Sequence, residues 1–393
     1  MHEVSPAHTC ASSPGAESAA EGTAVPRVAI LADDLTSAGD GAAPFRAAGF
    51  PARIGLADPD DVARAGGVAA FDLDTRGRTA EVAGAVTGAA ARAVAGADVI
   101  VKTVDSTLRG HLAVEIEAAL TASGRTTAVI APAFPAQRRT TVGGVQLLGG
   151  RPVHETAFAH DPVRPVRCAD LTVLIPGAVR GGAGARLVLA DASSDRDLDE
   201  LVAAVPDPGK VLWVGSPGLA AALARRLGPG PGSPSPASPP ARRRVLVVVG
   251  SLHPAGREQA ARFAARDTGA RVCVTDPAAV ERTRRELSGR GCALLHGPEG
   301  RTARSVPDTL ARAVVALAAH DAFDALVLTG GETARAVLLA LGVREMELLG
   351  EPEAGIALGL LDSPRRLPVA LKAGGFGDPD TLRRLAGLMG SPE

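Results

Sequence analysis

The chain has few aromatic side chains and almost no net charge. Aromatics make up 2% of its 393 residues, with no tyrosine and one tryptophan, so it offers few surfaces on which nucleic-acid bases could stack. Its 42 basic and 43 acidic side chains give a formal net charge of −1. Without a basic excess there is no electrostatic case for binding nucleic acid or an anionic membrane. We expect neither as a partner.

Cysteine is also scarce, and long apolar runs are missing. Four scattered cysteines contain no CxxC pair, so we expect no disulfide framework and no metal site, and a reducing cytoplasm fits. No apolar run approaches the roughly 20 residues of a membrane span. Residues 1–26 are rich in Ala, Ser, Gly and Glu and lack the basic and apolar regions of a signal peptide. We expect them to form a disordered tail.

Three nucleotide-binding signatures are absent as well. The chain has no GxxxxGK[ST] segment and no HRD or DFG set, which argues against a P-loop protein and a protein kinase. No GxGxxG follows the first predicted strand with an acid about 20 residues on, which disfavours a dehydrogenase. Any nucleotide must therefore be bound in another way.

Apolar residues make up 46% of the chain, enough for about two packed domains. Residues 228–240 read GPGPGSPSPASPP and cannot form helix or sheet, because proline removes donors and glycine adds chain entropy. We therefore predict a substrate-binding domain over 27–227, a linker over 228–243 and a nucleotide-binding domain over 244–390.

Each half alternates short apolar runs with helical stretches. This pattern predicts an α/β fold of two domains, each a mainly parallel sheet flanked by helices, with the active site in the cleft between the domains. The expected strands are 28–31, 52–56, 98–102, 128–131, 211–214, 244–249, 271–275, 293–296 and 325–328, and the expected helices are 81–95, 112–122, 259–265, 305–319 and 333–341. A hairpin over 143–150 is a further expectation.

Charged turns follow two strands of the first half. Asp33 and Asp34 come directly after the first strand, where a carboxylate could bind a sugar hydroxyl, take its proton or hold Mg²⁺ through water. One of the two could equally cap the next helix. The second turn carries Lys102, Asp105, Ser106, Thr107 and Arg109, which suit a small polar acid because Arg grips carboxylates and hydroxyls bind a polyol. A capped helix start with solvated charges is the alternative.

A third charged segment lies between these turns. Asp74 and Arg76 could add contacts to an anion, and a surface loop is an equally good interpretation of their spacing. Residues 131–141, APAFPAQRRTT, contain two prolines and read as an ordered loop after a strand.

Glycine turns follow strands of the second half. Their backbone N–H groups could face the phosphates of one nucleotide, although each turn alone is ordinary turn chemistry. The expected nucleotide-binding residues are Ser251, Gly330, Gly331, Glu332, Thr333, Gly374 and Gly375.

With these segments in order, the chain resembles the four-carbon acid sugar kinases over residues 27–385. The matching segments are ADDLT (32–36), KTVDSTLRG (102–110), PAFPAQ (132–137), VHET (153–156) with DP (161–162), GS (215–216), GGETA (330–334) and KAGGFG (372–377). The resemblance implies an ATP-dependent transfer of phosphate to the C4 hydroxyl of threonate, erythronate or 3-oxo-tetronate. It also implies an acid-sugar site on Asp33, Asp34, Lys102, Asp105, Ser106 and Arg109. The chain departs from the usual family pattern at Ser37, Arg138, His253 and Ala373.

We predict a mechanism in which Arg109 and Lys102 grip the substrate carboxylate or the transferring phosphoryl group. Asp33, Asp34 or Asp105 would orient or deprotonate the hydroxyl, and Mg²⁺ and the amides of the glycine turns would stabilise charge on the phosphates. Which acid is the base, which sugar acid is the substrate, and whether the chain forms a homodimer stay open. The rival interpretation is a non-catalytic sensor of sugar acid and nucleotide that retains the site.

Overall fold

The computed structural model describes residues 1–2, 25–56, 66–161, 164–182, 184–230, 244–251, 253–265, 269–298, 306–363 and 365–390. Most of the predicted tail and of the predicted linker, residues 3–24 and 231–243, lie outside these ranges. Within the described ranges, 15 strands form one sheet and three short strands form another. The predicted α/β class is confirmed, with a large, mainly parallel sheet flanked by helices.

The first half of the chain supplies eight neighbouring strands of the large sheet, in the order β2-β3-β1-β4-β11-β5-β10-β9. All pairings between them are parallel. The strands are β1 (Arg27–Ala32), β2 (Ala52–Gly55), β3 (Gly67–Asp72), β4 (Val99–Thr103), β5 (Thr127–Ala131), β9 (Val179–Arg180), β10 (Leu187–Leu189) and β11 (Val211–Gly215). The helices are α1 (Leu35–Ala47), α2 (Ala80–Ala93), α3 (Leu112–Ser123), α4 (Leu171–Leu174), α5 (Asp195–Ala203) and α6 (Pro217–Leu227).

The second half continues the sheet in the order β13-β14-β12-β15-β18-β17-β16. The first five of these strands pair in parallel, whereas β17 pairs antiparallel with both β18 and β16. The strands are β12 (Val245–Val249), β13 (Ala270–Cys273), β14 (Cys292–His296), β15 (Ala325–Thr329), β16 (Glu345–Glu353), β17 (Ile356–Leu361) and β18 (Pro368–Lys372). The helices are α7 (Pro254–Ala265), α8 (Ala279–Arg290), α9 (Val306–Ala319), α10 (Gly331–Ala340) and α11 (Thr381–Met389).

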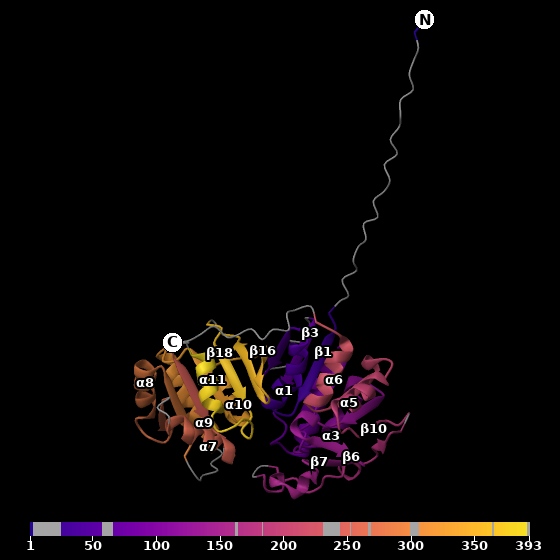
Figure 1. Ribbon diagram of the computed structural model, residues 1–393, viewed down its shortest axis with the longest axis horizontal. Helices are drawn as coiled ribbons and strands as arrows, with labels where there is room; N and C mark the ends of the chain where they lie inside the picture. Colours follow the sequence, from indigo (N-terminus) through magenta and orange to yellow (C-terminus); the bar gives the residue numbers. More distant parts are fainter. Residues whose placement is uncertain are drawn as a thin grey trace.

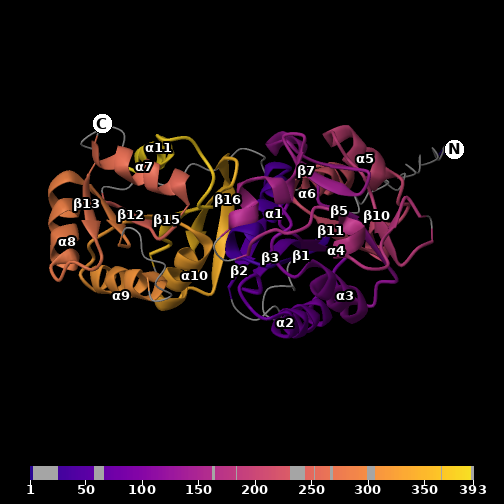
Figure 2. The same cartoon turned by 90° about the horizontal axis from the view of Figure 1, so that it is seen from below.

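Helices cover both faces of the sheet in each half (Figure 2). In the first half, α2 and α3 pack on one face and α1, α5 and α6 on the other. In the second half, α7 and α11 cover one face and α8, α9 and α10 cover the other. The strands can therefore be apolar on both sides, which is why they read as continuous apolar runs rather than as alternating patterns.

The two halves lie side by side and share one sheet (Figure 1). Strand β2 pairs antiparallel with β16, with Met346 opposite Ile54. Both side chains are fully buried in a core that also contains α1 and α10 residues. The large sheet thus does not stop between the two predicted domains.

The small sheet belongs to the first half of the chain and consists of three short strands joined by tight turns. Strands β6 (Arg139–Val142), β7 (Val145–Leu148) and β8 (Arg151–Pro152) are antiparallel neighbours. The hairpin expected over 143–150 is two successive hairpins, with turns at 143–144 and 149–150. Short 3₁₀ helices follow the prolines and loops: η2 (Pro135–Gln137), η3 (Val153–Glu155), η4 (Ala157–His160) and η5 (Pro208–Lys210).

Candidate active site

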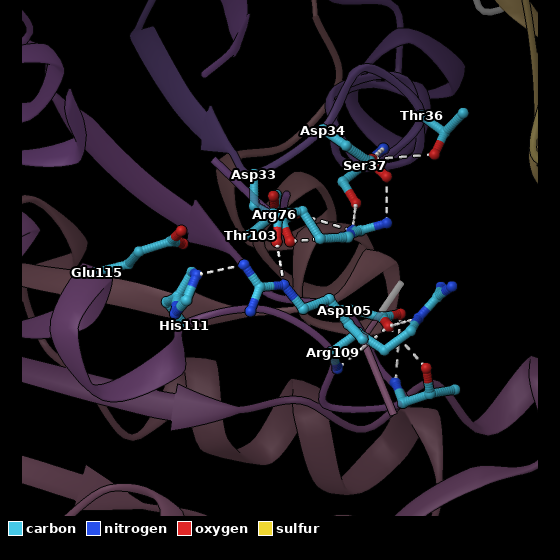
Figure 3. Close-up of polar contacts among 12 residues, drawn as sticks. Asp33, Asp34, Thr36, Ser37, Arg76, Thr103, Asp105, Arg109, His111 and Glu115 are labelled. Atoms are coloured by element: carbon cyan, nitrogen blue, oxygen red, sulfur yellow. Dashed lines mark hydrogen bonds and ion pairs between the residues drawn. The ribbon is translucent and has the colours of Figure 1, made fainter. Parts of the chain in front are cut away.

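The first charged turn is held together by one arginine. Asp34 caps α1, because its Oδ1 accepts a hydrogen bond of 2.7 Å from the Ser37 backbone N–H. Arg76, which follows β3, donates to both carboxylate oxygens of the buried Asp33 at 2.7 and 2.8 Å, and it also pairs with Asp34. Figure 3 shows Arg76 against these acids. Burial opposes the positive charge of Arg76, but the carboxylates of Asp33 and Asp34 raise its pKa well above the ordinary value.

The second turn is organised in the same way around Asp105 (Figure 3). Its Oδ2 accepts hydrogen bonds from Thr107 Oγ1 at 2.7 Å and from the Arg109 backbone N–H at 3.3 Å, and it pairs with the Arg109 guanidinium. Burial acts to raise the pKa of Asp105, but the positive charges of Arg109 and Arg76 hold it far below the usual range. Asp105 is therefore a permanent carboxylate that holds the Arg109 guanidinium in place.

Arg109 is also fixed from the other side. Its Nη1 lies 3.2 Å from Oδ2 of Asp161, and its guanidinium lies 5.3 Å from the centre of the Phe158 ring. Two carboxylates and one aromatic face thus set the position of a single cation.

Lys102 does not join this cluster. Its side chain is fully buried, and Nζ lies 2.7 Å from Oε2 of Glu115 on α3 and donates to the Thr103 carbonyl oxygen at 2.7 Å. Side chains alternate along a strand, so Lys102 points to the same face as Ile100, which packs in the core under α2 and α3. The structure therefore places Lys102 behind the sheet rather than in the cleft predicted for it.

A cleft of about 460 Å³, a volume that includes space open to solvent, lies between the two halves. Four of the predicted site residues line it: Arg76, Asp105, Ser106 and Arg109. Its other lining residues are Thr36, Ser37, Asp40, Thr103, Val104, Phe134, Arg139 and Pro217 from the first half and Ala373 and Phe376 from the second. Ser37 and Ala373, two of the departures from the usual family pattern, thus lie at the cleft.

Arg139 is a cleft residue that the sequence reasoning missed. It lies on β6, donates from Nη1 to Ser106 Oγ at 2.6 Å, and lies 5.5 Å from the centre of the Phe376 ring in the other half. Its buried Nε has no hydrogen-bond partner in the described protein, and burial lowers its pKa. The only sequence signal was its position in an ordered loop at a strand end.

The predicted glycine turns converge at the ends of β12, β15 and β18. A Cβ added at Gly330 would lie 3.3 Å from the Ser251 backbone nitrogen, and one added at Gly374 would lie 2.1 Å from Ser251 Oγ. Thr333 is buried at the start of α10, where a Cβ on Gly250 would lie 1.8 Å from its Oγ1. Glu332 is exposed. The three turns therefore lie against one another, and a side chain at Gly250 or Gly374 would collide with a neighbouring turn.

These glycine turns border the acid-bearing turn of the other half. A Cβ added at Gly331, the first residue of α10, would lie 3.7 Å from Oδ2 of Asp34. The α10 N-terminus carries a partial positive charge and free N–H groups. An anion held there would lie beside the first charged turn.

His253, a departure from the family pattern, and Asp74, a predicted substrate contact, both lie outside the cleft lining. His253 lies against Gly375, with Nε2 3.2 Å from where a Cβ would be, and burial and the charge of Lys372 lower its pKa. Asp74 pairs with Arg78 at 2.5 Å and lies 3.5 Å from Arg335 of α10. Asp74 thus lies at the contact between the halves and outside the cleft lining.

The described residues contain no group of three or more His, Cys, Asp or Glu side chains that could hold a metal ion. Among the same residues, no helix is both long and apolar enough to span a membrane.

Comparison with known proteins assigns a class to this arrangement. Residues 28–182 match the family model of a sugar-binding N-terminal domain, and residues 293–382 match that of a nucleotide-binding C-terminal domain. A D-threonate kinase of Bordetella bronchiseptica is 37% identical over 92% of this chain and 97% of its own length. A 3-oxo-tetronate kinase of Cupriavidus necator is 30% identical over 92% of this chain and 98% of its own length. The crystal structure of a Haemophilus influenzae protein of the DUF1537 family, 20% identical, superposes with a TM-score of 0.71 over 92% of this chain and all of its own, which supports the fold.

A sugar-binding half joined to a nucleotide-binding half defines a small-molecule kinase. The chain belongs to the family of four-carbon acid sugar kinases, as its sequence predicted, and it is an enzyme that takes a nucleotide and a small sugar acid.

Proposed function

We propose that this enzyme transfers the γ-phosphoryl group of ATP to the C4 hydroxyl of a four-carbon sugar acid, with D-threonate as the first candidate. The 37% identity to a D-threonate kinase favours that acid over erythronate and 3-oxo-tetronate. The observation that carries the proposal is the cleft, because cationic side chains of the sugar-binding half face Phe376 and Ala373, which belong to a glycine turn of the nucleotide-binding half.

Arg109 and Arg139 are the proposed anion grips. Both line the cleft and both are partly buried, so an anion between them meets charge that water screens weakly. Asp105 and Asp161 hold Arg109, and Ser106 and Phe376 hold Arg139. Cations held in place in this way can bind a substrate carboxylate or the phosphoryl group that is being transferred.

Asp33, Asp34 and Arg76 form the proposed floor of the site. With both carboxylates bound to Arg76, their contribution is to position the α1 N-terminus and Ser37. Hydroxyls of Ser106 and Thr36 remain at the cleft to bind the polyol. We propose no substrate contact for Lys102.

The nucleotide phosphates are proposed to bind at the turns around Ser251, Gly330 and Gly374, with the α10 N-terminus facing them. Mg²⁺ usually keeps several waters and binds through one or two carboxylates together with substrate phosphates. The bound ion would neutralise charge on the phosphates.

The predicted domain limits remain a proposal that the element order supports. The first half ends with α6 at Leu227, and the second begins with β12 at Val245. The cytoplasm is the proposed compartment, because the described cysteines, Cys168, Cys273 and Cys292, are free thiols. A homodimer is the proposed alternative to a monomer, and light scattering would decide between them.

A coupled ADP-release assay with Mg-ATP and a panel of D- and L-threonate, D- and L-erythronate and the 3-oxo-tetronates tests the function. We expect turnover with one member, D-threonate first. A folded protein that binds ATP and turns over none of them would contradict the proposal and favour the sensor. Arg109→Ala should lose most of kcat/KM without unfolding the protein.

A further inference from the structure

Asp40 is an acid of the cleft that belongs neither to the proposed anion grips nor to the proposed floor of the site. It lies on α1 four residues after Thr36 and three after Ser37, so the three side chains share one face of the helix. All three line the cleft. Asp40 is only partly exposed, and its carboxylate makes no hydrogen bond or ion pair with the described residues. An unpaired acid at the wall of a substrate cleft is a candidate for chemistry.

The other three acids of the site are bound by arginine. Asp33 and Asp34 pair with Arg76, and Asp105 pairs with Arg109 and accepts a hydrogen bond from Thr107. A carboxylate in such a pair has few lone pairs left, and the low pKa of Asp105 makes it a weak proton acceptor. Asp40 is free to point a lone pair at a bound hydroxyl.

Charged groups on several elements face Asp40. Burial raises its pKa well above the ordinary value, and Glu351 of β16 and Asp34 of α1 add to this, while Arg139 and Arg76 act to lower it. A carboxylate with a raised pKa binds a proton more strongly, and general bases work best when their pKa approaches the working pH. Arg139, one of the two proposed anion grips, lines the cleft together with Asp40 and Arg76, so a substrate held by Arg139 would lie beside Asp40.

We propose that Asp40 is the general base of the reaction, an inference that rests on the proposed function. The proton of the C4 hydroxyl passes to an Asp40 carboxylate oxygen as the hydroxyl oxygen forms a bond to the γ-phosphorus of ATP. The bond from that phosphorus to the β–γ bridging oxygen breaks, and ADP leaves with the electron pair. The protonated Asp40 then returns the proton to solvent.

Asp40→Asn tests this assignment, because it keeps the shape of the side chain and removes the basic oxygen. We expect kcat to fall by about 10²- to 10⁴-fold, with KM for Mg-ATP and for the sugar acid changed by less than about threefold. Asp40→Glu should recover part of the loss. Asp195→Asn is the matched control and should keep the wild-type kcat, because Asp195 is an exposed acid of α5 that does not line the cleft.

The pH dependence of kcat gives a readout that a purely structural role would not produce. Wild type should lose activity below a single apparent pKa that lies above the usual range of an aspartate, since the base is then protonated. The residual activity of Asp40→Asn should lack this acid limb. Because the wild-type profile needs no variant, its absence would overturn the proposal even if Asp40→Asn failed to fold.

Three outcomes contradict the assignment. Asp40→Asn with more than a third of the wild-type kcat would remove Asp40 from the chemistry while leaving the kinase function intact. A loss that is reversed by raising Mg²⁺ would make Asp40 a ligand of the metal rather than a base. If the wild-type protein turned over no acid of the panel, the proposed function would be contradicted, and the assignment of Asp40 as its base would be contradicted too.

Discussion

Among single residues, Lys102 shows how a buried charge depends on its partner. Its ammonium and the Glu115 carboxylate are both almost completely buried, and Oε1 of Glu115 has no hydrogen-bond partner among the described residues. Removing one member of such a pair leaves an uncompensated charge in the core, whereas replacing both by apolar residues is often tolerated.

Lys102→Met should therefore lower the free energy of unfolding by about 3–5 kcal/mol, measured by urea denaturation. Lys102→Met combined with Glu115→Leu should recover most of that loss. The double variant should also keep kcat within about threefold of wild type. A double variant with restored stability and a kcat reduced more than a hundredfold would return Lys102 to the chemistry.

For single residues, the sequence predicts the turns that form the site more successfully than it predicts which side chains of those turns line the cleft. Residues after β1 and β4 could be assigned to one edge because parallel strands end together, whereas β3 was not among the expected strands. The prediction put Lys102 in the cleft, whereas its side chain lies on the other face of the sheet. Side chains alternate along a strand, but which face borders the cleft is known only once the helices that cover the sheet have been placed. Arg139 and Asp40 were not singled out, because their place in the cleft depends on loop and helix packing that a linear pattern does not encode.

Among elements, the junction between β12 and α10 depends on the absence of a side chain. A Cβ on Gly250 would lie 1.8 Å from Oγ1 and 2.7 Å from Cβ of Thr333. Thr333 is buried at the start of a helix, where a β-branched side chain has little rotamer freedom. The added methyl group must therefore move the α10 N-terminus.

Gly250→Ala should weaken ADP binding at least tenfold in isothermal titration calorimetry, because the α10 N-terminus would no longer face the other glycine turns. Gly387→Ala is the matched control, since a Cβ there meets nothing within 4 Å and the residue lies inside α11. It should leave affinity unchanged and stability unchanged or higher by about 0.4–1 kcal/mol. Equal affinities for both variants and wild type would contradict a nucleotide site at this junction.

Strand β16 is an element that the sequence did not predict, for a physical reason. β16 contains Gly350, Pro352 and four glutamates, a composition that local propensity disfavours in strands. Pairing with β2 and β17 stabilises the strand conformation that its own residues disfavour. The apolar parallel strands, such as β12 and β15, were predicted because burial on both faces leaves a continuous apolar run.

For the whole molecule, the contact between halves includes a buried acid. Arg335 of α10 lies 2.6 Å from Oδ2 of Asp72 at the end of β3, and the Asp72 side chain is completely buried. Burial raises the pKa of Asp72 to about 6, although Arg335 acts to lower it. This ion pair and the β2–β16 pairing join regions that the sequence assigned to separate domains, and long-range pairings of this kind leave no local signal.

Asp72 should therefore make stability depend on pH. Between about pH 4 and 6 the folded state holds a proton on Asp72 that the unfolded chain releases, so the free energy of unfolding falls as pH rises through this window. A shift of about two units corresponds to roughly 3 kcal/mol. Urea denaturation at pH 4 to 7 should show this decline in wild type and a smaller one in Asp72→Asn. Parallel curves for the two proteins would contradict a raised Asp72 pKa.

Phosphate transfer to one hydroxyl across the cleft is tested most directly by ³¹P–¹H NMR of the product of Mg-ATP and D-threonate. We predict a phosphomonoester whose phosphorus couples to the two protons of the terminal C4 methylene, formed in equal amount to ADP. Phosphorus coupled to a methine proton, or only free phosphate beside ADP, would contradict it.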